Sequence, residues 1–210
     1  MNIRDEKFFI SKGTGVKEFL EKRISSNRTQ YRGDFDVCNL INKGVREKLI
    51  PAAVLILVIK RNNNITVIFT KRNNNLKNHA GQISFPGGKM EISDTSIENT
   101  ARRETMEEIG LNIKPSEILG KMSTWETRTG FLITPVLGFI SDPPKMRKNI
   151  YEVEEIFEVP INYLMNPKNH KIEKRSFEKK SYEFFTIQYL DYYIWGATAG
   201  LIINLYNILR

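Results

Sequence analysis

The sequence predicts an α/β fold in which strands and helices alternate along the chain. Residues 50–59, IPAAVLILVI, form a continuous apolar run rich in β-branched residues, which is typical of a central strand covered on both faces. Residues 95–109 have the pattern of a helix, and residues 131–140, FLITPVLGFI, return to that of a strand. Because strands and helices are interleaved, we expect layers of helix packed on a sheet.

The chain is expected to divide into an N-terminal helical extension, residues 1–48, and a main domain, residues 49–210. The extension carries mixed charge and three apolar residues that could anchor it by packing, Phe19, Leu20 and Ile24. No low-complexity linker follows it. We therefore expect the extension to pack on the domain.

Composition limits the class of protein. The 32 Lys and Arg residues exceed the 24 Asp and Glu residues, which gives a formal charge of +8 and favours anionic partners without choosing among them. Cys38 is the single cysteine, so the chain has no internal disulfide, and this fits a reducing compartment. The charged start of the chain and the short apolar runs indicate neither a signal peptide nor a bilayer span. We expect a cytoplasmic protein with no membrane partner.

The other elements follow from local patterns. Residues 61–64, RNNN, predict a turn that joins the 50–59 strand to a second strand, ITVIFT at 65–70, as a hairpin. A polar loop and a short apolar segment, ISF, then lead to Pro86-Gly87-Gly88. The rest is expected to comprise an acidic and apolar segment at 152–164, a Lys-rich loop at 168–180, a last strand YEFFTIQYL at 182–190 and a closing amphipathic helix at 195–209.

The 95–109 helix has identifiable ends and an unusual face. Thr95 followed by Glu98 is a capping-box pattern, and Gly110 stands where helices commonly end. At 100° per residue, Glu104 and Glu108 continue the line of the apolar residues before them within a stripe about 60° wide. Such a stripe normally packs into a core.

Two glutamates on a core-facing stripe need a physical reason. Like charges at i and i+4 are unfavourable by a few tenths of a kcal/mol, and burying them costs more. A divalent cation removes both penalties, because magnesium and manganese prefer carboxylate oxygens. Glu107, about 60° to one side, would complete three carboxylates within one turn. The alternative is a solvated acidic face. Gly87-Gly88, upstream, lets backbone approach a ligand closely.

Residues 88–111 resemble the Nudix box, G-x5-E-x7-R-E-U-x-E-E-x-G-U with U apolar. The gap from Gly88 to the Arg-Glu pair is one residue longer than in the standard box, and Asp94 stands where the earlier glutamate is expected. Thr105 occupies a position that is usually more apolar. The resemblance implies a Nudix fold, a mixed β-sheet between α-helices. The residues that match in register are Arg103, Glu104, Glu107, Glu108, Gly110 and Leu111.

The segment upstream, residues 69–88, is similar to the signature of coenzyme A pyrophosphatases, L-L-T-x-R-S-x3-R-x3-G-x3-F-P-G-G. Lys77 replaces an arginine and Asn73 a serine. The wider resemblance covers roughly residues 50–207. It implies hydrolysis of coenzyme A or acyl-coenzyme A to 3′,5′-ADP and 4′-phosphopantetheine, with Mg²⁺ or Mn²⁺ as cofactor. The residues that align without gaps are Thr70, Arg72, Gly81, Phe85, Pro86, Gly87 and Gly88.

The same resemblance implies roles for the box residues. Glu104, Glu107 and Glu108 would hold the metal, with the Gly87 carbonyl as a further ligand. Arg103 is expected to orient a glutamate through a charge-assisted bond rather than to touch substrate.

The upstream loop would supply the substrate contacts. Arg72 and Lys77 are the candidates for binding phosphate, together with the backbone at Gly87 and Gly88. His79 either donates to phosphate or braces the loop.

Other assignments stay open. The general base is Glu107, Glu152 or Glu155, and residues 152–158 could instead be an acidic helix start. Phe85 and the region of Trp195 are most simply interpreted as core, whereas Trp125 could stack on adenine.

Several rival functions also fit the sequence. The same metal site could cleave ADP-ribose, NADH or dinucleoside polyphosphates, and a Nudix-like module could sense nucleotides without catalysis. Isomerase chemistry would need an active-site cysteine, and Cys38 lies outside the motifs. Nucleic-acid binding is suggested only by charge, and no nucleic-acid partner is expected. Both a monomer and a homodimer are compatible with the sequence.

Overall fold

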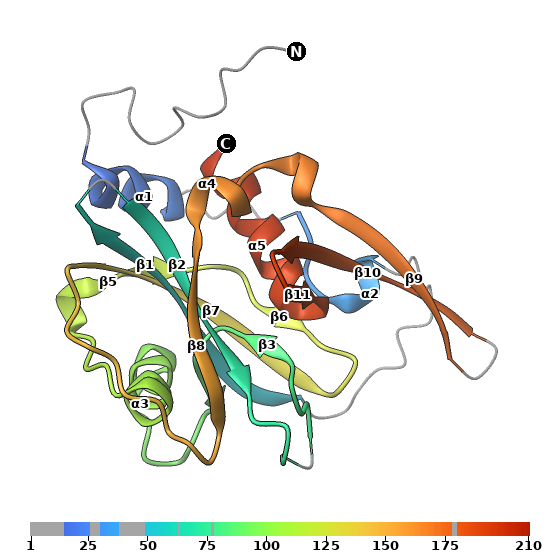
Figure 1. The fold of residues 1–210 in the computed structure, drawn as a ribbon, viewed down its shortest axis with the longest axis horizontal. Helices are drawn as coiled ribbons and strands as arrows, with labels where there is room; N and C mark the ends of the chain where they lie inside the picture. The colour runs from blue at the N-terminus through green and yellow to red at the C-terminus, as the bar shows by residue number, and fades with distance from the viewer. Residues whose placement is uncertain (1–14, 26–29, 38–48, 63, 77, 178–179) are drawn as a thin grey trace.

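A mixed sheet forms the centre of the computed structural model, which describes residues 15–25, 30–37, 49–62, 64–76, 78–177 and 180–210 (Figure 1). Strand β1, Ile50–Arg61, pairs antiparallel with β2, Asn64–Arg72, and parallel with β7, Phe131–Ser141. The predicted central strand and hairpin are confirmed. The sheet order is β3-β2-β1-β7-β5, with β4 paired to β1, β6 to β7 and β8 to β2; the further bounds are β3 Ile83–Ser84, β4 Gly87–Lys89, β5 Ile118–Lys121, β6 Trp125–Glu126 and β8 Val153–Pro160.

Helices cover both faces of this sheet, which explains the unbroken apolar run of β1. Leu55 and Leu57 point into a core that they share with helix α3, Ile97–Ile109. Ile56 and Val58 point the other way, into a core shared with helix α5, Gly196–Leu209. Because successive strand residues face opposite sides, both registers must be apolar. The predicted layered α/β architecture is confirmed.

The described part of the N-terminal extension packs on the domain. Helix α1, Val16–Ile24, contacts β5 and α5, and Leu20 and Ile24 are buried there. Phe19 packs against the same core. A single helical turn follows as α2, Asp34–Val37. Cys38 lies outside the described residues, and the division of the chain at residue 48 stays a prediction.

The N-cap of helix α3 lies one residue later than predicted. Ser96, rather than Thr95, is the N-cap: its hydroxyl accepts a hydrogen bond from the Asn99 amide at 3.1 Å. The Thr95 hydroxyl instead accepts from the Asn99 side chain. Adjacent hydroxyl residues offer two candidate caps, and the pattern selected the wrong one. The predicted end is confirmed, since Gly110 adopts a left-handed conformation with φ 67°.

The segment after β7 departs from the prediction. Residues 153–160 form strand β8, which pairs antiparallel with β2, so the helix-start interpretation of 152–158 is wrong. Val153, Phe157 and Val159 are buried in alternation, which is the period of a strand. The chain then turns through α4, Ile161–Leu164, and a short 3-10 helix, Pro167–Asn169; another, Pro115–Glu117, precedes β5.

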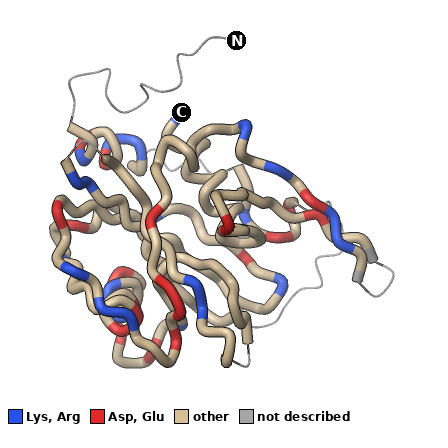
Figure 2. The backbone as a smooth tube through the Cα atoms, in the orientation of Figure 1, with Lys and Arg blue, Asp and Glu red and all other residues tan. Residues whose placement is uncertain are grey.

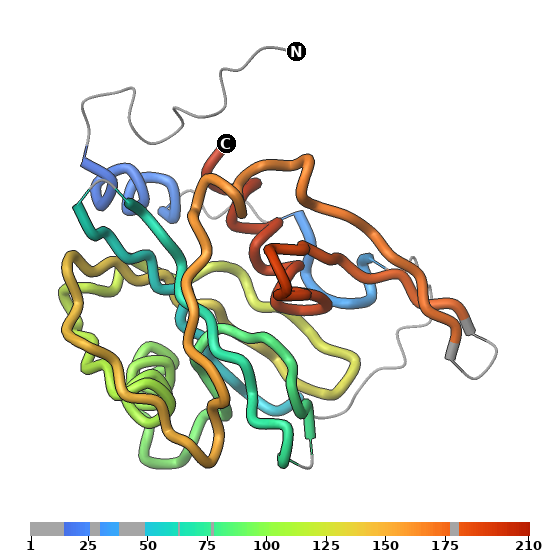
Figure 3. The backbone as a smooth tube through the Cα atoms, viewed as in Figure 1, coloured from blue at the N-terminus to red at the C-terminus, as the bar shows by residue number. Residues whose placement is uncertain are grey.

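A second, three-stranded sheet comprises β9, Lys171–Phe177, β10, Lys180–Tyr189, and β11, Tyr192–Trp195. The predicted Lys-rich loop is therefore wrong, because most of it is the strand β9. Residues 171–176 are all exposed, so no apolar alternation marks them as a strand, and pairing with β10 alone orders them. The predicted last strand is followed by β11. The β9–β10 hairpin projects from the body of the protein (Figure 3).

Helix α3 contacts β8, and acidic residues lie along both elements (Figure 2). Within the described residues, no helix combines the length and apolar character needed to cross a bilayer.

Candidate active site

A cavity of about 850 Å³ lies where α3, β1, β4 and the loop after β2 meet the start of α5. Glu104 and Glu108 of α3 line one end of it, together with Glu152 and Arg72. Carboxylates from α3 and from residue 152, together with the guanidinium of Arg72 at the end of β2, therefore share one cavity although they come from three separate segments.

The stripe on α3 points its glutamates inward. Ala101 and Ile109 on the same helix are fully buried, and the side chains of Glu104 and Glu108 are only 15% and 3% exposed. Thr105, at the box position that is usually apolar, is also buried and donates its hydroxyl to the Ala101 carbonyl at 2.7 Å. Its polar group is thus satisfied within the helix, which explains how threonine is accommodated there.

The environment of Glu108 disfavours its charged form. Burial raises the pKa of the Glu108 carboxyl to about 8, and the nearby Glu104 carboxylate acts in the same direction. The Gly87 amide donates to Glu108 Oε2 at 3.2 Å, and Arg72 Nη1 lies 4.0 Å from Oε1; both lower the pKa without reversing the shift. Burial also raises the pKa of Glu104. Two buried carboxylates with raised pKa values are typical of functional sites.

The Gly87-Gly88 turn allows the backbone to approach these carboxylates. A Cβ on Gly88 would lie 2.5 Å from the Glu104 carboxyl, and a Cβ on Gly87 would lie 2.3 Å from the Ala53 carbonyl of β1. Gly87 also has φ 156°, a backbone conformation that side chains rarely adopt. Gly87 therefore requires glycine, because its Cβ would meet the backbone of β1. A side chain at Gly88 would instead have to displace the Glu104 carboxyl of α3.

Arg103 bonds to three acidic side chains around it. Its guanidinium bonds to Asp94 through two nitrogens at 3.0 Å, to Glu107 at 2.9 Å and to Glu104 at 3.0 Å. It also donates to the Lys89 carbonyl. Asp94, which stands where the earlier box glutamate is expected, bonds to this arginine through both of its oxygens.

Two of the predicted glutamates are engaged elsewhere. The Glu107 side chain is 54% exposed, pairs with Arg103 and does not line the cavity. Glu155 lies on β8, and its carboxylate accepts a hydrogen bond from the Tyr192 hydroxyl at 2.6 Å, outside the cavity lining. Among the three candidate bases, Glu152 is the one that faces the cavity.

The upstream loop contributes two of its three predicted residues. Arg72 lines the cavity, and its Nε is buried with no hydrogen-bond partner among the described residues. His79 also lines it, in a left-handed conformation, with Nδ1 2.9 Å from Gln82 Oε1. This bond braces the loop. Lys77 lies outside the described residues.

The far end of the cavity is lined by residues that the motifs did not identify. Trp125 is 1% exposed and lines the cavity, and its indole Nε1 donates to Asp34 at 2.9 Å. Asp34 and the start of α5 reach the cavity from segments distant in the sequence. No local pattern links these segments, which is why sequence reasoning missed them.

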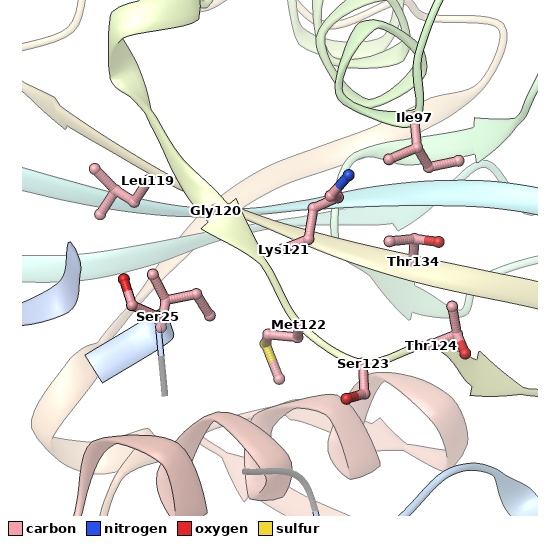
Figure 4. A pocket seen from close by; sticks show the side chains of 10 residues that line it. Ser25, Ile97, Leu119, Gly120, Lys121, Met122, Ser123, Thr124 and Thr134 are labelled. Carbon is pink, nitrogen blue, oxygen red and sulfur yellow. The ribbon is translucent and has the colours of Figure 1, made fainter. Parts of the chain in front are cut away.

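A second hollow, of about 570 Å³, lies between α1, β5 and the start of α3 (Figure 4). Lys121 points toward α3, where it pairs with Glu98 at 2.9 Å, and Met122 points toward α5. The described residues that line this hollow include no acidic side chain. Its chemistry therefore does not resemble that of the carboxylate cavity.

The donor set of the cavity suits a hard cation. Within the described residues, no three His, Cys, Asp or Glu side chains are already gathered as a ligand cluster, because Glu107 turns toward Arg103. Glu104 and Glu108 nevertheless place carboxylate oxygens in one buried site, and Glu152 is close enough to raise the pKa of both. Carboxylates that repel one another in a buried site are the ligands that magnesium and manganese bind.

Comparison with known proteins agrees with this geometry. Residues 49–190 match the NUDIX domain family. The chain is 34% identical over 160 residues to "Nudix hydrolase 15, mitochondrial" of Arabidopsis thaliana, with 73% of this chain and 56% of that protein covered. It is 32% identical over 151 residues to "Uncharacterized Nudix hydrolase NudL" of Photorhabdus laumondii, with 72% of this chain and 80% of that protein covered.

The fold is likewise similar to a solved structure. The crystal structure of a MutT/nudix family protein from Enterococcus faecalis superposes with a TM-score of 0.55 over 99% of this chain and 74% of that one, at 16% identity. The chain spans little more than half the length of the Arabidopsis relative, and most of the length of the NudL protein. The family match over most of the chain and the relatives above 30% identity show that this protein belongs to the Nudix family.

Proposed function

We propose that this protein hydrolyses the diphosphate of coenzyme A or acyl-coenzyme A with Mg²⁺ or Mn²⁺, to give 3′,5′-ADP and 4′-phosphopantetheine or its acyl form. The observation that carries the proposal is the buried pair Glu104 and Glu108, with Arg72 of the upstream signature 4.0 Å from Glu108 in the same cavity. The carboxylates account for the metal chemistry. The signature loop that holds Arg72 accounts for the substrate.

Glu104 and Glu108 are the proposed metal ligands, with Glu107 and the Gly87 carbonyl as further candidates. When bound, a divalent cation neutralises charge on the diphosphate and orients it for attack by water. The protein supplies a buried, negatively charged site, and the Gly87 amide keeps the Glu108 carboxylate in place.

Arg72 and His79 are the proposed phosphate-binding residues. An arginine guanidinium offers several donors in one plane, and the unpartnered Nε of Arg72 leaves donor capacity for a phosphate oxygen. The backbone of Gly87 and Gly88 adds a surface that ligand atoms can approach closely, because neither residue has a side chain. Lys77 is proposed to act with them on the resemblance alone.

Glu152 is the proposed general base. It lines the cavity, whereas Glu107 is held by Arg103 and Glu155 by Tyr192. A base must reach the attacking water, so the cavity position favours Glu152. Arg103 would act as a positioning residue, since its guanidinium bonds to Glu104.

The test is product analysis with coenzyme A, acyl-coenzyme A, NADH, ADP-ribose and a dinucleoside polyphosphate, each with Mg²⁺ or Mn²⁺. We expect 3′,5′-ADP to form and kcat/KM to be highest for a coenzyme A substrate. Glu108→Gln and Glu104→Gln should lower kcat by about 10² to 10³-fold, as expected when charge stabilisation in the transition state is lost.

Glu98→Gln is the matched control, because Glu98 lies on the same helix but pairs with Lys121 away from the cavity. It should keep near wild-type kcat. Equal activity on NADH or ADP-ribose would refute the coenzyme A assignment and leave the metal site standing. Near wild-type turnover in Glu108→Gln would refute the metal assignment itself.

We further propose that the protein acts in the cytoplasm on a small nucleotide substrate, with no nucleic-acid or membrane partner, as a monomer or homodimer. The absence of an internal disulfide supports the reducing compartment. Sedimentation with and without substrate would decide the oligomeric state.

A further inference from the structure

Part of the cavity is built by residues outside the region that matches the family. The match covers residues 49–190, but the cavity is also lined by the segment 31–37, here named the strap, and by the start of α5. In Figure 3 the strap runs beside α5. The end of the cavity that lies farther from Glu104 and Glu108 is named here the strap lobe.

The strap is fixed to α5 at its beginning. The buried side chain of Asn204 accepts from the Tyr31 amide at 3.1 Å and donates to the Tyr31 carbonyl at 2.7 Å. The Tyr31 ring also packs edge-on against Phe185 of β10, with ring centres 4.9 Å apart. A buried asparagine that satisfies both polar groups of one residue fixes that residue in a single position.

The strap is also fixed to strand β6, Trp125–Glu126. Gly33 forms a parallel bridge with Glu126, and the Glu126 amide donates to the Arg32 carbonyl at 2.8 Å. A Cβ on Gly33 would lie 2.5 Å from the Glu126 carbonyl, so the backbones touch.

Asp34 completes this connection with both of its carboxylate oxygens. Oδ1 accepts from the Trp125 indole at 2.9 Å, and Oδ2 accepts from the Arg128 amide at 2.9 Å. Trp125 and Arg128 both line the cavity, as does Asp34. The Asp34 carboxylate therefore holds the two ends of the 125–128 segment against the cavity, and its oxygens are engaged by protein donors.

The strap lobe has a different character from the carboxylate end. Its cation Arg128 is offset by the anions Asp34 and Glu183, so the lobe offers no excess of positive charge for another phosphate. Its walls are apolar and aromatic with hydroxyl groups between them. They include Val37, Trp125, Ile133, Phe184, Ala197 and Thr198.

We propose that the strap lobe binds the uncharged arm of the substrate, and that Asp34 is the positioning residue that forms its wall. An extended arm of apolar segments with amide groups suits walls of this composition. The inference rests on the proposed function, under which this arm is the pantetheine of coenzyme A. The nucleoside and its phosphates would then lie toward Arg72 and His79.

The test compares Asp34→Ala with Asp36→Ala as its matched control. Asp36 lies on the same helical turn and is exposed, and among the described residues its carboxylate accepts a hydrogen bond from the Arg32 amide of the strap alone. We expect Asp34→Ala to raise KM for coenzyme A about tenfold with kcat within about twofold, because binding of a remote group is lost. The inhibition constant of 4′-phosphopantetheine should rise by a similar factor, and that of 3′,5′-ADP should stay unchanged.

Ala197→Phe tests the lobe from its opposite wall without touching the Asp34 hydrogen bonds. It should also raise the inhibition constant of 4′-phosphopantetheine and leave that of 3′,5′-ADP unchanged. This test remains available even if Asp34→Ala does not fold. Weaker inhibition by 3′,5′-ADP, or equal loss for both products, would overturn the inference. So would unchanged constants in both variants while the wild type cleaves coenzyme A. A wild type that does not cleave coenzyme A would overturn the proposed function, and this inference with it.

Discussion

Arg103 and Asp94 face each other in two parallel hydrogen bonds, with Nε 3.0 Å from Oδ1 and Nη2 3.0 Å from Oδ2. The Thr100 hydroxyl and the Glu91 amide, each at 2.9 Å, also donate to Oδ2 of Asp94. The pair ties the loop after β4 to the middle of α3. Because the same guanidinium bonds to Glu104, the pair also determines where that proposed metal ligand lies.

Asp94→Asn should destabilise the protein at neutral pH and reduce its sensitivity to acid. The hydrogen bonds from Arg103 hold the pKa of Asp94 at about 2, below the ordinary 3.8. A lowered pKa stabilises the fold above pH 4, and that stability is lost as pH falls through 2. The expected contribution is about 1–2 kcal/mol.

Urea unfolding at pH 7 and pH 3 measures this contribution. The difference in free energy of unfolding between wild type and Asp94→Asn should be larger at pH 7 than at pH 3. Glu91→Gln is the control, because the Glu91 side chain is 61% exposed and its carboxylate comes no closer to Arg103 than 3.9 Å. This substitution should change the free energy of unfolding by less than about 0.5 kcal/mol. An equal gap at both pH values would contradict the assigned role of the carboxylate.

The main features of the fold could be predicted because β1 and α3 each carry a clear pattern of apolar residues. Both faces of β1 are buried, so its apolar run is unbroken, and Glu104 and Glu108 lie on the stripe that points inward. The β9 strand could not be predicted, because exposed residues paired to one neighbour leave no pattern of burial.

The site was predictable only in part, for a similar reason. Helical geometry placed Glu107 to one side of the stripe, but only the structure shows Arg103, four residues earlier, holding it outward. Asp34 reaches the cavity through contacts with residues more than 90 positions away, 91 to Trp125 and 94 to Arg128. Contacts at such separations depend on tertiary packing and leave no local motif.

Mg²⁺ or Mn²⁺ should raise the melting temperature of the wild-type protein, and Glu108→Gln should abolish this shift. A ligand that binds only the folded state at 100 times its Kd stabilises by about 2.7 kcal/mol. Replacing a buried carboxylate by an amide removes a negative charge from the proposed site. Thermal melts with each metal and with EDTA provide the measurement, and Glu98→Gln should keep the shift. A shift of wild-type size in Glu108→Gln would argue against Glu108 as a ligand.

Arg72→Lys should raise KM for the diphosphate substrate by about tenfold, because lysine cannot make the bidentate contact of a guanidinium. Arg72 lines the cavity with a buried, unpartnered Nε, so the loss should appear in substrate binding more than in stability. The neighbouring Lys71 pairs with Glu154 at 3.2 Å outside the cavity lining, which makes Lys71→Gln the control. Steady-state kinetics decide the matter, and an unchanged KM in Arg72→Lys would exclude a bidentate phosphate contact.

Gly200→Ala should destabilise the protein, although alanine favours helices. The new Cβ would lie 2.2 Å from Cη2 and 2.6 Å from Cζ2 of Trp125, a ring that is 1% exposed and bonded to Asp34. Helix propensity would contribute up to about 1 kcal/mol in favour, against about 1–3 kcal/mol for overpacking a core. A net loss of about 1–2 kcal/mol is expected, because the anchored ring cannot move aside.

A double-mutant cycle with Trp125→Phe isolates this clash. Phenylalanine lacks the outer indole atoms that the new Cβ would meet, so Gly200→Ala should cost less in the Trp125→Phe background than in the wild type. Urea unfolding of the four proteins gives the coupling energy, which should be at least about 0.5 kcal/mol for residues in direct contact. Additive losses would mean that the Trp125 ring yields to the added methyl group, and that Asp34 does not fix the wall of the strap lobe through it.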